Sequence, residues 1–182
     1  MEGIAMELKG SKTEQNLIAA FAGESQARNK YTYFASVAKK EGYEQIAAIF
    51  QETADNEKEH AKMWFKELNG IGTTAENLLE AAEGELLEWS ALYTDSAGIA
   101  LDEGFKDISV AFKMIAKVEE FHEWRYRKLL SRLKDDTIFK REEPIKWQCR
   151  NCGFVYEGKT PPEKCPACLH PKAFFEPMRD NY

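Results

Sequence analysis

The sequence predicts a mainly α-helical protein, in which a four-helix bundle is followed by a small metal-binding domain. Two observations predict the bundle. Apolar residues recur every three or four positions over most of residues 11–134, and glycines punctuate this pattern at intervals that suit helices. A third observation predicts the small domain, because all four cysteines lie close together near the C-terminus as two Cys-x-x-Cys pairs.

The first half of the helical region predicts two helices joined by a tight turn. SKTE at the start of the pattern has the form of a capping box, with Ser11 as the N-cap and Glu14 reaching back, and Gly42 is a natural stop. The second helix is expected from about Tyr43 to Asn69, where an Asn-Gly pair favours an end.

The second half predicts a further helical hairpin. TTAE (73–76) is another possible capping box, and it opens a helical region that runs to about Glu103. Gly84 is expected to divide this region into a short connecting helix and a long one. Gly104 separates it from a fourth helix at about 106–134.

A charged segment at about 135–146, which contains a proline, is expected to link the two domains. From Trp147 onward the sequence changes to short aromatic stretches with glycine, proline and cysteine. The predicted domains are therefore 1–140 and 141–182.

Each predicted helix carries acidic residues or histidine in the middle of its apolar stripe. The fourth helix, with VEEFHEW at 118–124, places Glu119 and His122 there, and the second helix places Glu57 and His60 there. The other two helices contribute only acids. Counting from the turn glycines puts Glu24 level with Glu57, and Glu88 level with Glu119, to within ~2–5 Å at 1.5 Å per residue.

Buried charges of this kind need compensation, because an unpaired one costs several kcal/mol or more. One Glu–His pair would more often be a structural hydrogen bond. Two Glu-x-x-His motifs with acids on both remaining helices instead favour a di-iron or di-manganese site. The candidate ligands are Glu24, Glu57, His60, Glu85, Glu88, Glu119 and His122.

The cysteines form a second candidate metal site. Twelve residues separate the two Cys-x-x-Cys pairs, and four thiolates suit tetrahedral coordination. Spacing alone leaves zinc and a single iron as alternatives. The candidate ligands are Cys149, Cys152, Cys165 and Cys168.

The composition limits the classes of partner. The 182 residues carry a net charge of −6 with acids and bases interleaved, so we expect no nucleic-acid partner. No stretch approaches ~18 consecutive apolar residues, so we expect no membrane partner and a cytoplasmic location.

Together these motifs resemble the rubrerythrin family, whose members join a ferritin-like di-iron bundle to a rubredoxin domain. The resemblance covers nearly the whole chain. It is carried by AFAGESQARNKY (20–31), NEKEHAKMWF (56–65), GELLEW (84–89), EEFHEWRY (119–126) and the cysteine module.

The resemblance implies a role for each ligand. Glu57 and Glu119 would bridge two irons, with Glu24 on the first iron and with Glu85 and His122 on the second. The two remaining ligands, His60 and Glu88, would exchange at the first iron, with His60 bound in the reduced state and Glu88 in the oxidised state.

The resemblance also implies a peroxidase that reduces hydrogen peroxide to water in defence against oxidative stress. Its cofactors would be a di-iron centre and one iron held by four cysteines. An external reductase or a rubredoxin-type donor would supply electrons to a homodimer or larger homo-oligomer. Two alternatives stay open: a ferroxidase that stores iron, and a non-catalytic scaffold with a zinc ribbon.

Overall fold

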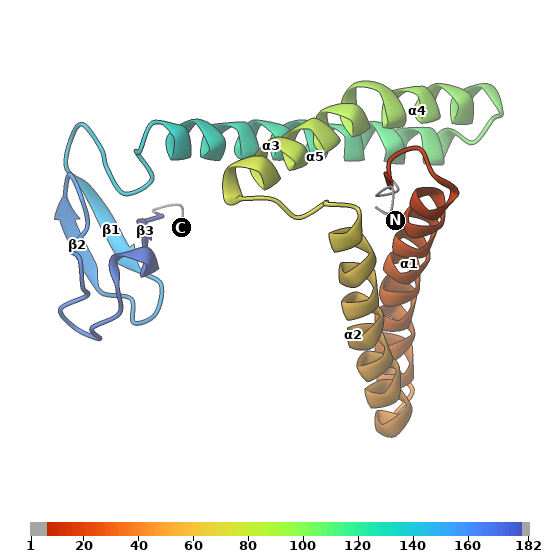
Figure 1. Cartoon of the computed structure of the whole chain (residues 1–182), viewed down its shortest axis with the longest axis horizontal. Coiled ribbons are helices and arrows are strands. Elements are labelled where there is room, and N and C mark those ends of the chain that lie inside the picture. Colours follow the sequence, from red (N-terminus) through yellow and green to blue (C-terminus); the bar gives the residue numbers. More distant parts are fainter. Residues whose placement is uncertain (1–6, 180–182) are drawn as a thin grey trace, which may run out of the picture. The chain divides into compact units, whose positions relative to one another are not determined.

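The computed structural model describes residues 7–179, which form five α-helices and a small three-stranded sheet (Figure 1). The chain divides into two compact units, one ending at Gly72 and the other beginning at Thr73. Over residues 7–179, the helices lack the combination of length and apolar character that crossing a bilayer requires.

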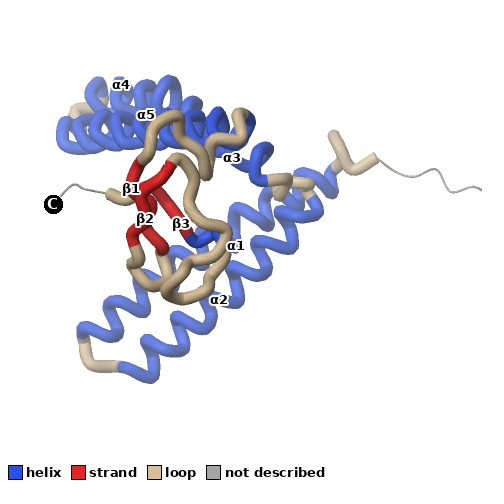
Figure 2. The backbone as a smooth tube through the Cα atoms, turned by 90° about the vertical axis from the view of Figure 1, so that its left-hand side faces the viewer, coloured by secondary structure: helices blue, strands red, loops and turns tan. Residues whose placement is uncertain are grey.

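The first unit is a helical hairpin of α1 (Lys12–Lys40) and α2 (Glu44–Glu67), which lie side by side in both views (Figures 1 and 2). The Ser11 hydroxyl accepts a hydrogen bond from the Glu14 amide at 3.0 Å, as predicted. The Glu14 carboxylate accepts from the amide of Gly10 at 2.6 Å instead of reaching Ser11. The turn to α2 passes through Gly42, whose φ of +85° suits a residue without a side chain.

In the second unit, α3 (Thr74–Leu87), a π-helical turn η1 (Glu88–Leu92) and α4 (Tyr93–Asp102) follow one another and pack against α5 (Lys106–Lys134). The predicted capping box of α3 is confirmed, with reciprocal bonds between Thr73 and Glu76.

The expected division of the third helical region at Gly84 is wrong. Gly84 lies inside α3, and the regular helix changes only at η1. A glycine within a helix costs only about 1 kcal/mol relative to alanine, an amount that packing against α5 can outweigh.

Small residues fill the interior of each helical hairpin. The buried residues are Ala35, Ala38, Ala47, Ala54 and Ala61 in the first, and Ala82, Ala97, Ala100, Ser109 and Leu130 in the second. Several large apolar residues of the helices stay exposed, among them Ile46 (47%), Ile99 (59%) and Ile115 (44%). Neither hairpin by itself buries the apolar stripes that carry the candidate ligands.

The C-terminal module is an antiparallel sheet of β1 (Ile145–Cys149), β2 (Val155–Gly158) and β3 (Phe175–Pro177) in the order β2-β1-β3. A short 3₁₀ turn, η2 (Lys172–Phe174), precedes β3. The core of the C-terminal module consists of the buried rings of Trp147 and Phe175 beside two cysteines. The indole N–H of Trp147 donates to the carbonyl of Gly158 at 2.9 Å, so this buried polar group is satisfied.

Candidate metal centres

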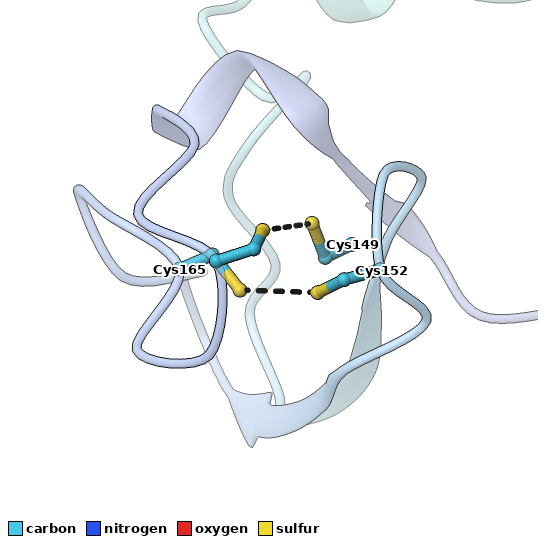
Figure 3. A group of neighbouring side chains, drawn as sticks. Cys149, Cys152 and Cys165 are labelled. Atoms are coloured by element: carbon cyan, nitrogen blue, oxygen red, sulfur yellow. Dashed lines mark hydrogen bonds between the residues drawn. The ribbon is translucent and has the colours of Figure 1, made fainter.

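The four cysteines converge on one point in the C-terminal module. The Sγ atoms of Cys149 and Cys168 lie 3.8 Å apart, and those of Cys152 and Cys165 lie 3.6 Å apart (Figure 3). A metal with four sulfur ligands at ~2.3 Å has sulfur–sulfur distances of about 3.8 Å. The spacing of the thiols therefore fits a single tetrahedral metal ion.

Two similar turns bring the cysteines together. In the first, the amide of Gly153 donates to the carbonyl of Cys149 at 2.8 Å, and Gly153 has a φ of +79°. In the second, the amide of Leu169 donates to the carbonyl of Cys165 at 2.8 Å, and Leu169 has a φ of +63°. A leucine rarely adopts this left-handed conformation, so the second turn is strained in the way that binding sites often are.

The surroundings of Cys168 and Cys152 shift the pKa values of these two thiols in opposite directions. A hydrogen bond from the backbone of His170 lowers the pKa of Cys168 to about 6, which favours the thiolate form of this sulfur. The backbone of Phe154 lowers the pKa of Cys152, but the neighbouring thiols and burial outweigh it and raise that pKa to about 12. Such a cluster binds a cation by releasing protons.

The first hairpin brings together Glu24 from α1 with Glu57 and His60 from α2. One donor atom from each of the three lies within 4.8 Å of the others. His60 Nδ1 is 2.8 Å from Glu57 Oε2 and 3.9 Å from Glu24 Oε1. The prediction that turn counting would place Glu24 opposite Glu57 is confirmed.

The second unit contains a matching group, formed by Glu85 from α3 with Glu119 and His122 from α5. His122 Nδ1 is 2.6 Å from Glu119 Oε2 and 3.6 Å from Glu85 Oε1. Each group therefore combines one glutamate from one helix with a Glu-x-x-His pair from the next.

Within each group, neighbouring carboxyl groups compete for a proton. A hydrogen bond with Glu57 raises the pKa of Glu24, whereas hydrogen bonds with His60 and Glu24 lower the pKa of Glu57. Burial, followed by the neighbouring Glu119, raises the pKa of Glu85. A bound cation would replace such a proton, and oxygen with imidazole is a donor set that suits iron.

Glu88 lies outside both groups. It begins the π-helical turn, and its carboxylate hydrogen-bonds the phenol of Tyr93. Burial is the largest cause of the raised pKa of Tyr93, followed by the negative charges of Glu88 and Glu119. Of the two glutamates predicted as ligands in this helical region, the structure groups Glu85 with Glu119 and His122, and the role predicted for Glu88 stays a prediction.

A contact that the sequence did not predict ties η1 to α5. The indole N–H of Trp89 donates to Glu123 Oε2 at 2.8 Å, and Arg127 Nε donates to Glu123 Oε1 at 2.6 Å. The only local sign in the sequence is the i,i+4 pair of Glu123 and Arg127, which is common on helix surfaces.

A second unpredicted feature is the indole of Trp64. Its N–H is buried and has no hydrogen-bond partner of good geometry within the described part of the chain. It nevertheless lies close enough to Glu24 to offset a small part of the rise in the pKa of that carboxyl group. The indole is therefore available as a donor to the first group.

Comparison with known proteins gives matches over both parts of the chain. A family model described as rubrerythrin matches residues 15–130, and one described as the rubredoxin-like domain of rubrerythrin matches residues 147–176. A rubrerythrin of Porphyromonas gingivalis is 57% identical, covering 96% of this chain and 94% of its own length. Rubrerythrin-1 of Clostridium acetobutylicum is 50% identical, and the rubrerythrin of Nitratidesulfovibrio vulgaris is 49% identical. Each of these two alignments covers 96% of this chain and 98% of the relative's length.

Proposed function

This chain belongs to the rubrerythrin family, and we propose that it is a non-haem di-iron peroxidase that reduces hydrogen peroxide to water. The observation that carries this proposal is the pair of matching Glu and Glu-x-x-His groups in a chain that also holds four converging cysteines. The reaction consumes one peroxide, two electrons and two protons and yields two waters. A pair of irons can supply the two electrons, and a separate one-electron centre can restore them one at a time.

We assign the bridging positions to Glu57 and Glu119, because each is the carboxylate of a Glu-x-x-His pair. Glu24 would bind the first iron, and Glu85 with His122 would bind the second. When bound, the irons would supply two electrons and Lewis acidity for cleavage of the O–O bond.

His60 and Glu88 are assigned as exchanging ligands of the first iron. Imidazole suits the ferrous ion, and an additional carboxylate better balances ferric charge. The Tyr93 phenol supports this role, since its hydrogen bond to Glu88 gives this carboxylate a defined partner when it is not a ligand.

The four cysteines would hold one iron. This iron would take electrons from an external reductase or a rubredoxin-type donor and pass them, one at a time, to the iron pair. The spacing of the four sulfur atoms fits one tetrahedral ion, and the lowered pKa of Cys168 favours the thiolate that such an ion needs.

The test is an anaerobic titration of fully reduced protein with hydrogen peroxide, followed by visible absorption. We expect the iron pair to be oxidised at one equivalent of peroxide per pair, and Glu57→Ala to abolish this step. Uptake of iron in amounts far above three per chain, without peroxide turnover, would instead identify a storage protein. If natively isolated protein carried zinc in the cysteine site, that site could not pass electrons to the iron pair.

A further inference from the structure

The indole of Trp64, in the first hairpin, carries a buried polar group without a suitable partner. Its N–H is screened from solvent, and within residues 7–179 no acceptor of good geometry faces it. An indole nitrogen can only donate a hydrogen bond. Leaving such a donor buried and unpaired costs about 1–3 kcal/mol, so its retention in the hairpin points to an acceptor that becomes available under other conditions.

Trp64 lies on the face of α2 that carries two candidate ligands. It follows His60 by four residues and Glu57 by seven, and residues with these spacings share one face of an α-helix. His60 Nδ1 lies 3.9 Å from Glu24 Oε1, so this face of α2 meets α1 at Glu24.

The packing of α1 against α2 brings Glu24 close to the level of Trp64. The ring of Phe21, three residues before Glu24, stacks on the ring of Phe65 with centroids 4.7 Å apart. Phe65 is the next residue after Trp64. The indole also offsets a small part of the rise in the pKa of Glu24, which requires the two side chains to be near each other. The Glu24 carboxyl group is therefore an acceptor within reach of the indole.

A metal would change what this acceptor offers. A carboxylate that holds a metal is ionised, and a hydrogen bond to an ionised acceptor is roughly twice as strong as one between neutral groups. Groups that hydrogen-bond a metal ligand also fix its orientation, and their removal typically lowers metal affinity 10–100-fold. The buried N–H therefore gains most when Glu24 is a metal ligand.

We propose that Trp64 is a positioning residue for Glu24, and that its indole N–H donates to the Glu24 carboxylate when this carboxylate binds the first iron. The inference rests on the proposed di-iron function and adds a residue outside the set of candidate ligands. Trp64 touches neither iron nor peroxide. The cost of the unpaired N–H in the metal-free protein is removed when the metal binds, and this difference adds to the affinity for the metal.

NMR of the full-length protein gives the first test, with Zn²⁺ as a diamagnetic probe of the site. The chain contains four tryptophans, and Trp64→Phe identifies the Trp64 indole signal by its absence. Saturation with Zn²⁺ should move this signal downfield and slow the exchange of its proton with solvent. The signal of Trp124, which is 53% exposed on the other hairpin, should not move. An unmoved Trp64 signal in zinc-loaded protein overturns the proposal.

The carboxyl ¹³C signals of the zinc-loaded protein identify the acceptor. The signal of Glu24 should differ between the unaltered chain and Trp64→Phe. Glu85 is the matched internal control, because it holds the equivalent place in the second group, and its signal should be the same in both proteins. If the signal of Glu24 is also the same in both, the indole has another acceptor and the proposal is overturned.

Metal affinity separates positioning from packing. The benzothienyl analogue of tryptophan, placed at position 64, keeps the shape of the ring but has sulfur instead of the N–H. It should leave the urea stability of the metal-free protein unchanged, because an unpaired N–H contributes no hydrogen bond. It should nevertheless weaken the binding of Fe²⁺ to the pair about 10–100-fold. The same analogue at position 124 should alter neither quantity.

The outcomes distinguish this inference from the proposed function. If the analogue at position 64 binds Fe²⁺ as tightly as the unaltered chain, the positioning role is overturned and the di-iron proposal stands. If the helices of the unaltered chain bind neither Zn²⁺ nor Fe²⁺, both are overturned.

Discussion

The cysteines and the carboxylate–imidazole groups offer different donor atoms, and this difference assigns a separate task to each centre. Four sulfur atoms at tetrahedral spacing suit one metal with a fixed geometry. The glutamates and histidines offer oxygen and nitrogen atoms, a donor set that suits iron. A single substitution can therefore remove one centre without altering the other.

Replacing Cys149 with alanine should separate the two centres. Loss of one thiolate should remove the iron of the C-terminal module, while the groups around Glu57 and Glu119 keep all their atoms. We expect steady-state peroxidase turnover with a biological reductant to fall at least ~10-fold, since one of four ligands is lost. Oxidation of the chemically reduced iron pair by one equivalent of peroxide should be unchanged.

Stopped-flow absorption and steady-state assays on the same preparation measure the two quantities. An exposed position in the module, for example Lys159→Ala, provides the control that should alter neither. Unchanged turnover in Cys149→Ala would show that electrons enter the iron pair by another route.

At the scale of secondary structure, the π-helical turn η1 determines which residues of the third helical region face α5. It lies directly after the α3 segment that carries Glu85, and Trp89 ties it to Glu123 on α5. π-Helical turns often occur at functional sites, because the inserted residue changes the direction of the side chains that follow.

Trp89→Phe should destabilise the fold by about 0.5–1.5 kcal/mol, because Glu123 loses a hydrogen bond while the aromatic ring is largely kept. Urea unfolding followed by circular dichroism measures this change. Trp124→Phe is the matched control, since Trp124 is 53% exposed on the same hairpin. Equal losses for the two variants would show that the bond to Glu123 contributes nothing.

The start of α3 should depend on pH through Glu76. Hydrogen bonds from the backbone and side chain of Thr73 lower the pKa of Glu76 below its usual value of 4.5. A carboxylate with a lowered pKa in the folded state stabilises that state above pH 4.5, and this contribution disappears as the pH falls through the lowered value.

Acidification below pH 4.5 should therefore speed amide hydrogen exchange in the first turn of α3, after correction for the intrinsic rate. Glu76→Gln should remove this pH dependence, and Glu80→Gln in the next turn should keep it. NMR-detected exchange measures both. A pH profile that is the same in all three proteins would contradict the role of this cap.

At the scale of the whole molecule, every candidate ligand of the iron pair lies in the helices before the linker, and every cysteine lies after it. The boundary predicted near residue 140 stays a prediction, since the division into compact units falls between Gly72 and Thr73 instead. A truncation can test whether the helical part is sufficient by itself.

A chain that ends at Lys140 should stay helical and bind two irons, because no α-helix or candidate ligand of the pair is removed. The chemically reduced truncated protein should be oxidised by peroxide in a single turnover, and its steady-state rate with a biological reductant should collapse. Metal analysis, circular dichroism and the two assays measure these outcomes. Loss of single-turnover oxidation from a folded, iron-loaded truncation would show that the pair depends on residues beyond Lys140.

The sequence by itself determined the features that depend on neighbouring residues. The structure confirms the helix caps at Ser11 and Thr73 and the hairpin turns at Gly42 and Gly104, which depend on interactions within a few positions. The predicted convergence of the four cysteines is also confirmed, because each Cys-x-x-Cys pair is local although the two pairs are not. The Glu-x-x-His pairs were visible for the same reason, because residues three apart share a helix face.

Only the tertiary structure decided which glutamate of the third helical region faces Glu119. Sequence reasoning offered both Glu85 and Glu88 as ligands. The structure brings Glu85 together with Glu119 and His122, while Glu88 begins the π-helical turn beside Tyr93. The bond from Trp89 to Glu123 and the exposure of the large apolar residues are likewise set by packing between helices, which no local pattern encodes.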